Sequence, residues 1–211
     1  MRAWLAWHDA YDDPASSLSR RLNVVRWRLG EVLDASAGEP CQLLSLCAGD
    51  GHDVIPVLAA RTASSPVSAL LVEQDEDLAR RAAAAVTSSG LESVGVRCAD
   101  AGNPSSFDDV VPVDVLLLCG IFGNIEHSRV KGTIDVLHHV LAPGGYLIWT
   151  RGGSDPDRRP EVRSWFRAAG FDEVSFDGAP EPFGVGVNQP GSIKHGDRRQ
   201  LPRQLFRFVE P

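Results

Sequence analysis

The chain has 211 residues, 43% of them hydrophobic, and a formal net charge of -7 from 21 basic and 28 acidic side chains. This length fits one large domain, or one domain with a small appendage, and the hydrophobic content excludes global disorder. The acidic balance disfavours a nucleic acid as the main partner, because a phosphate backbone selects basic proteins. Basic residues do cluster at 20–28 and 194–207, and we interpret these clusters as solvated faces and helix ends.

The cysteines indicate a reducing compartment. None of the four forms a Cys-x-x-Cys pair, and all lie in or beside apolar runs, so buried free thiols are favoured over a metal site or disulfides. The first residues lack the apolar core of a signal peptide, and no apolar run approaches the length of a membrane span. We therefore expect a cytoplasmic protein with no membrane partner and no metal.

Helical and strand-like patterns alternate along the chain. Helical patterns predict helices at 15–34, 53–62, 75–90 and 160–171, and a helix followed by a turn within 127–145. Apolar runs predict strands at 41–47, 67–73, 94–100, 113–120, 145–151, 172–178 and 203–209. The segment 178–203 is rich in Gly and Pro and is predicted to be a long loop. Alternation of this kind predicts an α/β fold with a mostly parallel sheet covered on both faces.

A glycine turn follows the first predicted strand in the stretch LSLCAGDGHD, where Gly49 and Gly51 flank Asp50. In open α/β sheets, ligands bind beyond the carboxyl ends of the strands. Glycine permits a positive φ and a close approach of the main chain to a ligand, and the next helix offers free N–H groups. Taken alone, the turn is also compatible with an ordinary strand–helix connection.

Three further strand ends favour a nucleoside ligand. Glu73 ends the second strand, where a carboxylate accepts hydrogen bonds from ribose hydroxyls. Asp100 ends the third, where it is placed to accept from an exocyclic amine. The stretch 119–124 ends the fourth with small residues and then an aromatic, which leaves room and an apolar wall.

A dinucleotide fits this turn poorly. Its fingerprint needs a third glycine where this chain has Val54, and Asp50 would face the pyrophosphate. An acid in the turn suits a cationic or zwitterionic ligand better. The chain also lacks a Tyr-x-x-x-Lys pair, so a nicotinamide-dependent reductase is the less favoured alternative.

At these residues the sequence resembles the class I S-adenosylmethionine-dependent methyltransferases. LSLCAGDGHD is similar to their first motif, with Cys47 in place of the usual first glycine. LLVEQDEDLARRA, VRCADAGNP and VDVLLLCGIFGNI resemble the second to fourth motifs, and LAPGGYLIWTR resembles the next turn and strand. The resemblance covers about residues 41–177, and the whole chain is similar to an uncharacterised bacterial subgroup of this family.

This resemblance implies a three-layer Rossmann-like sandwich with a seven-stranded, mostly parallel sheet in the order 3-2-1-4-5-7-6. The last strand is antiparallel, and 203–209 fits it. S-adenosylmethionine is the implied cofactor, with Glu73 on its ribose and Asp100 and Ala101 beside its adenine. The implied cofactor-binding residues are Cys47, Ala48, Gly49, Asp50, Gly51, Glu73, Gln74, Asp100, Ala101, Cys119, Gly120 and Ile121. We expect an N-terminal helical cap or lid at 1–36 and a cofactor-binding domain at 37–211.

No catalytic motif stands out, and methyl transfer does not require one. The reaction is an in-line displacement that positioning and desolvation accelerate, and a base is needed only when the acceptor arrives protonated. His8, Tyr11 and Asn124 are the candidates, each of which has a structural alternative as a solvated, packing or capping residue. Trp4 and Trp7 either join such a lid or pin the terminus to the core.

The acceptor itself is not identified by the sequence. The Asn/Asp-Pro-Pro-aromatic motif of the amino- and DNA-methylating branches is absent, which favours a small-molecule acceptor. Arg151 ends the fifth strand, where it either pairs with an acidic substrate or forms a salt bridge. We expect a monomer or homodimer, and the rival to an enzyme is a non-catalytic module that binds the same cofactor.

Overall fold

The computed structural model describes residues 11, 13–36, 38–61, 66–191 and 198–209. Its strands are β1 (Cys41–Leu46), β2 (Val67–Glu73), β3 (Val94–Cys98), β4 (Val113–Leu118), β5 (Leu141–Gly152), β6 (Phe171–Asp177) and β7 (Phe183–Pro190). They form one seven-stranded sheet in the order β3-β2-β1-β4-β5-β7-β6, in which β7 is antiparallel to both neighbours. The predicted strand order and antiparallel strand are confirmed.

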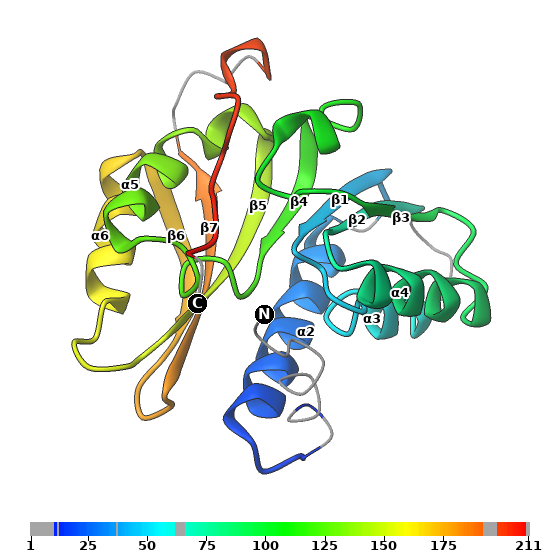
Figure 1. Ribbon diagram of the computed structural model, residues 1–211, viewed down its shortest axis with the longest axis horizontal. Helices are drawn as coiled ribbons and strands as arrows, with labels where there is room; N and C mark the ends of the chain where they lie inside the picture. Colours follow the sequence, from blue (N-terminus) through cyan, green and yellow to red (C-terminus); the bar gives the residue numbers. More distant parts are fainter. Residues whose placement is uncertain (1–10, 12, 37, 62–65, 192–197, 210–211) are drawn as a thin grey trace.

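Helices cover both faces of this sheet (Figure 1). They are α2 (Ser17–Ala35), α3 (Ile55–Ala59), α4 (Glu76–Ser88), α5 (His127–Asp135) and α6 (Arg159–Ala168), with short 3-10 turns at Pro104–Ser106, Leu137–His139 and Arg198–Gln200. Side chains of α2, α3 and α4 pack into one hydrophobic core, and those of α5 and α6 pack into the other. The predicted three-layer sandwich is confirmed.

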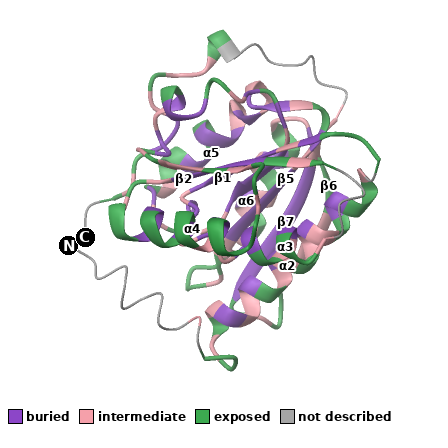
Figure 2. Cartoon of the chain, turned by 90° about the vertical axis from the view of Figure 1, so that its right-hand side faces the viewer, coloured by how far each residue is buried: buried purple, intermediate pink, exposed green. Residues whose placement is uncertain are grey.

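Adjacent strand residues divide between the two cores, since successive side chains point to opposite faces. Leu43 joins the core under α2 and α3, whereas Leu44 joins the core under α5 and α6. The central strands are therefore buried, whereas the edge strands β3 and β6 are partly exposed and the outer helix faces are exposed (Figure 2). In the second core Trp149 stacks on Phe166 with ring centroids 5.2 Å apart, and its Nε1 donates to Asn188 Oδ1 at 2.7 Å.

Local sequence sets where the helices begin. Ser16 caps α2 by accepting from the Ser19 N–H, and Asp75 caps α4 by accepting from the first-turn N–H groups. Pro56 lies in the first turn of α3, where its missing N–H costs nothing. The segment predicted as a helix and then a turn within 127–145 contains α5, which ends at Asp135, and the 3-10 turn Leu137–His139, but β5 already begins at Leu141.

The last strand of the sheet was predicted at the wrong place. It is β7, which lies inside the segment predicted to be a loop, and 203–209 forms only an isolated bridge between Phe208 and Ile125. The glycines that suggested a loop are needed in β7 because aromatic rings lie over them. A Cβ at Gly184 would be 2.8 Å from Phe176, and one at Gly186 would be 2.4 Å from Trp149.

Two further expectations are corrected. The N-terminal arginines are not simply solvated, because Arg28 forms two hydrogen bonds with Asp177 of β6 and Arg20 pairs with Glu181. These contacts attach α2 to β6 and to the turn between β6 and β7. The four cysteines are free, but they are not all buried, since Cys98 on the edge strand β3 is exposed. No helix among the described residues is long and apolar enough to cross a membrane.

Candidate functional site

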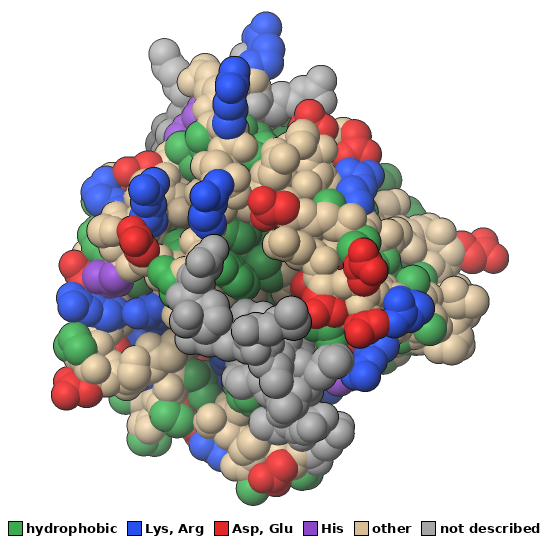
Figure 3. Space-filling model, in the orientation of Figure 1, with side chains coloured by type: hydrophobic (Ala, Val, Ile, Leu, Met, Phe, Trp, Pro, Cys, Tyr) green, Lys and Arg blue, Asp and Glu red, His purple; other side chains and the backbone are tan. Residues whose placement is uncertain are grey.

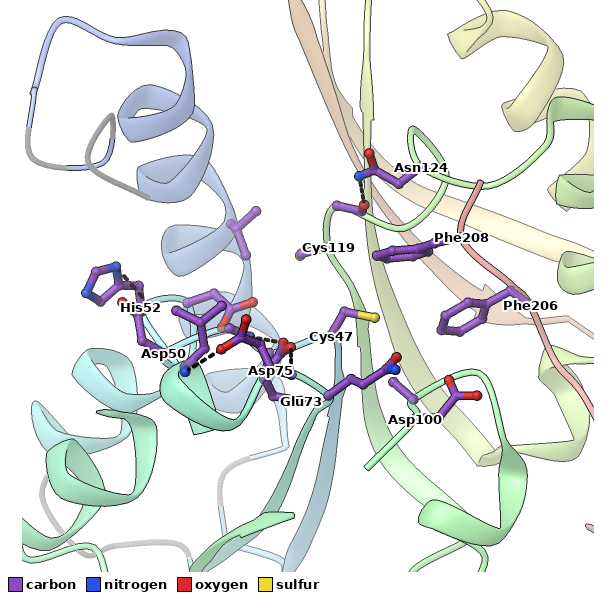
Figure 4. A pocket seen from close by; sticks show the side chains of 18 of the residues that line it. Cys47, Asp50, His52, Glu73, Asp75, Asp100, Cys119, Asn124, Phe206 and Phe208 are labelled. Atoms are coloured by element: carbon purple, nitrogen blue, oxygen red, sulfur yellow. Dashed lines mark hydrogen bonds and ion pairs between the residues drawn. The ribbon is translucent and has the colours of Figure 1, made fainter. Parts of the chain in front are cut away.

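A cavity of about 580 Å³ lies at the carboxyl ends of the central strands (Figure 4). The loops after β1, β2, β3 and β4 all contribute to it, together with α2 and the C-terminal segment. Ten of the residues implied to bind cofactor line this one cavity, namely Cys47, Ala48, Gly49, Asp50, Glu73, Gln74, Asp100, Ala101, Cys119 and Gly120. Residues from four separate parts of the sequence therefore face one another across a single space.

The other two implied residues, Gly51 and Ile121, lie behind the lining. A Cβ at Gly51 would be 2.5 Å from Ile55 Cδ1, so this glycine allows the turn to pack on α3. Ile121 is fully buried in the core on the α5 and α6 side. Both support the loops that form the cavity.

The turn after β1 has an uncommon backbone. Cys47 has a φ of 57° and Gly49 a φ of 59°, both in the left-handed region. Glycine adopts this region without cost, whereas another residue is strained there. Cys47 occupies the position where the motif that the sequence resembles usually has its first glycine. Its left-handed backbone is a physical reason for a glycine at that position.

Glu73 connects this turn to the loop after β2. Its Oε2 accepts from the Gly49 N–H at 2.8 Å, and its Oε1 accepts from the Asp75 N–H at 2.8 Å. An ionised carboxylate has about four acceptor positions, so Glu73 keeps capacity for hydroxyl donors in the cavity. The same side chain both holds the turn and lines the cavity.

Asp100 stands on the β3 side of the cavity. Its Oδ1 accepts from the Gly102 N–H at 2.7 Å, and its Oδ2 accepts from Gln204 Nε2 at 3.3 Å. These contacts fix the carboxylate beside Ala101, which is buried.

A buried charge cluster lies at the α2 end. Asp53 is only 8% exposed, and burial raises the pKa of its carboxyl to about 6, with a further contribution from Asp50. Arg26 and Arg21 oppose this rise. Among the described residues Asp53 Oδ1 has no hydrogen-bond partner, which is costly for a buried oxygen and suits a donor group of a ligand.

Tyr11 belongs to the same end of the cavity. Its hydroxyl accepts from Arg21 Nη2 at 2.9 Å, and burial raises its pKa, so the phenol stays neutral. Burial likewise raises the pKa of the Cys47 and Cys119 thiols well above the usual value. These thiols are therefore neutral walls and not nucleophiles.

Two of the three catalytic candidates lie in the cavity wall. Tyr11 and Asn124 line it, while His8, Trp4 and Trp7 lie outside the described residues. Asn124 Nδ2 donates to Gly120 O at 2.6 Å and so braces the loop after β4. Arg151 donates to the backbone oxygen of Phe122 in the same loop and is not part of the lining.

The comparison with solved structures concerns the whole sheet and its helices. An O-methyltransferase family protein from Burkholderia thailandensis is 16% identical, with a TM-score of 0.66, and the match covers 83% of this chain but only 57% of that one. The 1,6-didemethyltoxoflavin-N1-methyltransferase of the same species, solved with 1,6-didemethyltoxoflavin and S-adenosylhomocysteine bound, is 18% identical. Its TM-score is 0.65, and the match covers 90% of this chain and 84% of that one.

The chain has the Rossmann-like fold of class I methyltransferases. A possible exported protein from Bordetella parapertussis shares this fold at 15% identity and a TM-score of 0.62, with 82% of this chain and 68% of that one covered. No protein-family model matches the chain, and no curated protein matches it in sequence.

Within this methyltransferase fold, several lining residues were not predicted. They are Arg21, Leu22, Val25, His52, Asp53, Asp75, Leu78, Gln204, Phe206, Arg207 and Phe208. The C-terminal residues had a signal, since aromatics at every second position place two rings on one side of an extended segment. That alternation was interpreted as a strand of the sheet. Asp53 and Arg21 had no signal beyond their place at helix ends.

The lining is acidic. Five carboxylates contribute to it, from Asp50, Asp53, Glu73, Asp75 and Asp100, against the two guanidiniums of Arg21 and Arg207. Figure 3 shows hydrophobic side chains at the floor of a hollow on this face, with acidic side chains along one rim. Such a site favours a ligand with positive charge over one with phosphates.

Proposed function

We propose that this protein is a methyltransferase that uses S-adenosylmethionine and methylates a small molecule. One observation carries the proposal: the residues implied by four separate motifs line a single cavity at the carboxyl edge of the sheet. The parallel sheet brings the strand ends together, and each of these ends carries side chains of the kind that its motif implies for the cofactor.

The chemistry of the lining fits the parts of this cofactor. The α2 end offers the unpartnered carboxylate oxygen of Asp53 and the guanidinium of Arg21, which match an ammonium and a carboxylate group. In the middle, Glu73 has remaining acceptor positions for ribose hydroxyls. On the β3 side, Asp100 is held where it accepts from an exocyclic amine.

The bound cofactor would carry the methyl group on a sulfonium sulfur. Once the acceptor has taken the methyl group, the rest of the cofactor is a neutral thioether. The protein's task is to align the acceptor and exclude water, and the neutral Cys47 and Cys119 thiols in the lining contribute to the second. Asn124 and Tyr11 offer polar groups to the acceptor in our proposal. A protonated acceptor requires a base as well, and Asp53 is not that base in our proposal because its carboxylate pairs with the ammonium group of the cofactor.

The experiment is isothermal calorimetry of the purified protein with S-adenosylmethionine, S-adenosylhomocysteine and NAD(H). Binding of the two sulfur nucleosides alone supports the proposal, and binding of NAD(H) alone supports a reductase. Binding of neither removes the cofactor assignment. Transfer of labelled methyl to a pool of small acceptors then separates an enzyme from a non-catalytic module, which binds without turnover.

The proposal includes a cytoplasmic location and a monomeric or homodimeric state. Light scattering after size exclusion measures the second directly, and fractionation of cells that express the protein measures the first. A mass above that of a dimer contradicts the expected assembly.

A further inference from the structure

The C-terminal segment 204–208 forms one wall of the cavity and is attached at both ends. The Leu205 N–H donates to Gly102 O at 2.7 Å, in the loop after β3. The Val209 N–H donates to Asn124 O at 2.9 Å, in the loop after β4. The segment therefore bridges the loops after β3 and β4, and Gln204, Phe206, Arg207 and Phe208 line the cavity.

This wall presents aromatic faces. Phe206 and Phe208 lie two residues apart in an extended segment, so both side chains project to the same side. Figure 4 shows their rings directed toward the cavity. The ring centroids are 6.0 Å apart and the ring planes differ by only 27°. Arg207 lies between them and is exposed. Leu205, just before Phe206, is buried, and its carbonyl accepts from Thr133 Oγ1 at 3.0 Å, which anchors the start of the segment.

Gln204 joins the wall to Asp100. Its Nε2 donates to Phe206 O at 2.6 Å and to Asp100 Oδ2 at 3.3 Å. A Cβ at Gly102 would lie 2.2 Å from Phe206 O, so glycine at this position allows the segment to approach so closely. The segment is thus built against the carboxylate that the proposed function places beside the base.

We infer that the segment Gln204–Phe208 completes the base-binding part of the nucleoside site. The half-buried ring of Phe208 offers its face to a planar base, and the buried ring of Phe206 packs behind it. Gln204 is a positioning residue that holds Asp100 where it accepts from a base amino group. Aromatic side chains stack well on every base, because each base has a π-face. The inference rests on the proposed function for the identity of the ligand.

The test is calorimetry with two probes, adenosine and S-adenosylhomocysteine, on the full chain. Phe208→Ala removes the half-buried ring, and Val209→Ala is the matched control, because Val209 is 41% exposed, does not line the cavity and keeps its backbone hydrogen bond. We expect Phe208→Ala to lower the affinity for both probes by the same factor, about 5- to 150-fold, which is the range for loss of one base–aromatic contact. The control binds both as the wild type does.

Gln204→Leu is the second variant, since it keeps the size of the side chain and removes the donor to Asp100. It is expected to weaken adenosine by about 3- to 10-fold and keeps the proposal testable if Phe208→Ala unfolds. Wild-type affinity for adenosine in the variants overturns the inference. Weaker binding of S-adenosylhomocysteine with unchanged adenosine also overturns it, because the segment then serves another part of the ligand.

The two proposals fail separately. The adenosine measurements decide the base site, whereas binding of S-adenosylhomocysteine to the wild type decides the proposed function. A wild type that binds neither probe overturns both.

Discussion

Asp53 is a buried acid whose replacement has opposite effects on stability and on binding. Burial raises the pKa of its carboxyl from 3.8 to about 6. At about 1.4 kcal/mol per pKa unit, the ionised group costs the folded state about 3 kcal/mol at pH 7.5. We therefore expect Asp53→Asn to raise the free energy of unfolding by up to about 3 kcal/mol at pH 7.5. The same variant loses a charged partner for the ligand.

The pH dependence identifies the cause. Between pH 3.8 and about 6 the folded state binds more protons than the unfolded state, so this group's contribution to the unfolding free energy falls as the pH rises through that window. The gain in unfolding free energy from Asp53→Asn is largest above pH 6 and decreases to zero as the pH falls toward 4. Glu92→Gln, a change at an exposed acid away from the cavity, is the control and is expected to shift neither curve.

The assay is urea unfolding of both variants and the wild type at pH 7.5 and pH 4.5, followed by the fluorescence of tryptophans that include the fully buried Trp149. Calorimetry at pH 7.5 gives the affinity for S-adenosylhomocysteine, which is expected to fall in Asp53→Asn by about 1.5–3 kcal/mol, typical of a lost hydrogen bond to a charged group. A variant that is less stable than the wild type at pH 7.5, or a difference that does not change with pH, refutes the reasoning.

Two further substitutions test the turn and the last strand. Glu73→Ala removes the acceptor for the Gly49 and Asp75 N–H groups and is expected to weaken the binding of S-adenosylhomocysteine by about 1–3 kcal/mol. The affinity of Glu73→Gln is expected to lie between those of Glu73→Ala and the wild type. Unchanged affinity would exclude Glu73 from the site. Gly186→Ala forces a Cβ against Trp149 and is expected to lower the unfolding free energy by about 1–3 kcal/mol without changing the affinity for S-adenosylhomocysteine. The control is Gly132→Ala, in a helix with open space around it, which is expected to be neutral or stabilising by up to about 1 kcal/mol. Equal stability of these two glycine variants would show that β7 yields to the extra methyl group.

The functional residues at the strand ends were predictable because each acidic side chain follows directly after an apolar run. Glu73 ends β2 and Asp100 follows the end of β3 by two residues, and parallel strands bring their carboxyl ends to one edge. Once the alternation of strands and helices was established, a shared cavity followed. The positions of these residues needed no knowledge of tertiary contacts.

Other features depended on contacts that the sequence does not reveal. Glycines in β7 suggest a loop until the rings of Phe176 and Trp149 are placed over them. The alternation around Phe206 is the same for a sheet strand and for an isolated extended wall, and only the partners of Leu205 distinguish the two. Asp53 lies near a helix start, where an exposed acid is ordinary, and its burial results from packing against α2 and Cys119.

Under the proposed function, the five carboxylates around the cavity affect what happens after methyl transfer. Methyl transfer turns a sulfonium into a neutral thioether, so the attraction between the acidic lining and the bound nucleoside weakens at the moment the product forms. Under the proposed function, spent cofactor is therefore expected to leave more readily than fresh cofactor, which reduces inhibition by the product. Salt screens exposed charges over about 8 Å at physiological ionic strength, so this preference is strongest in dilute buffer.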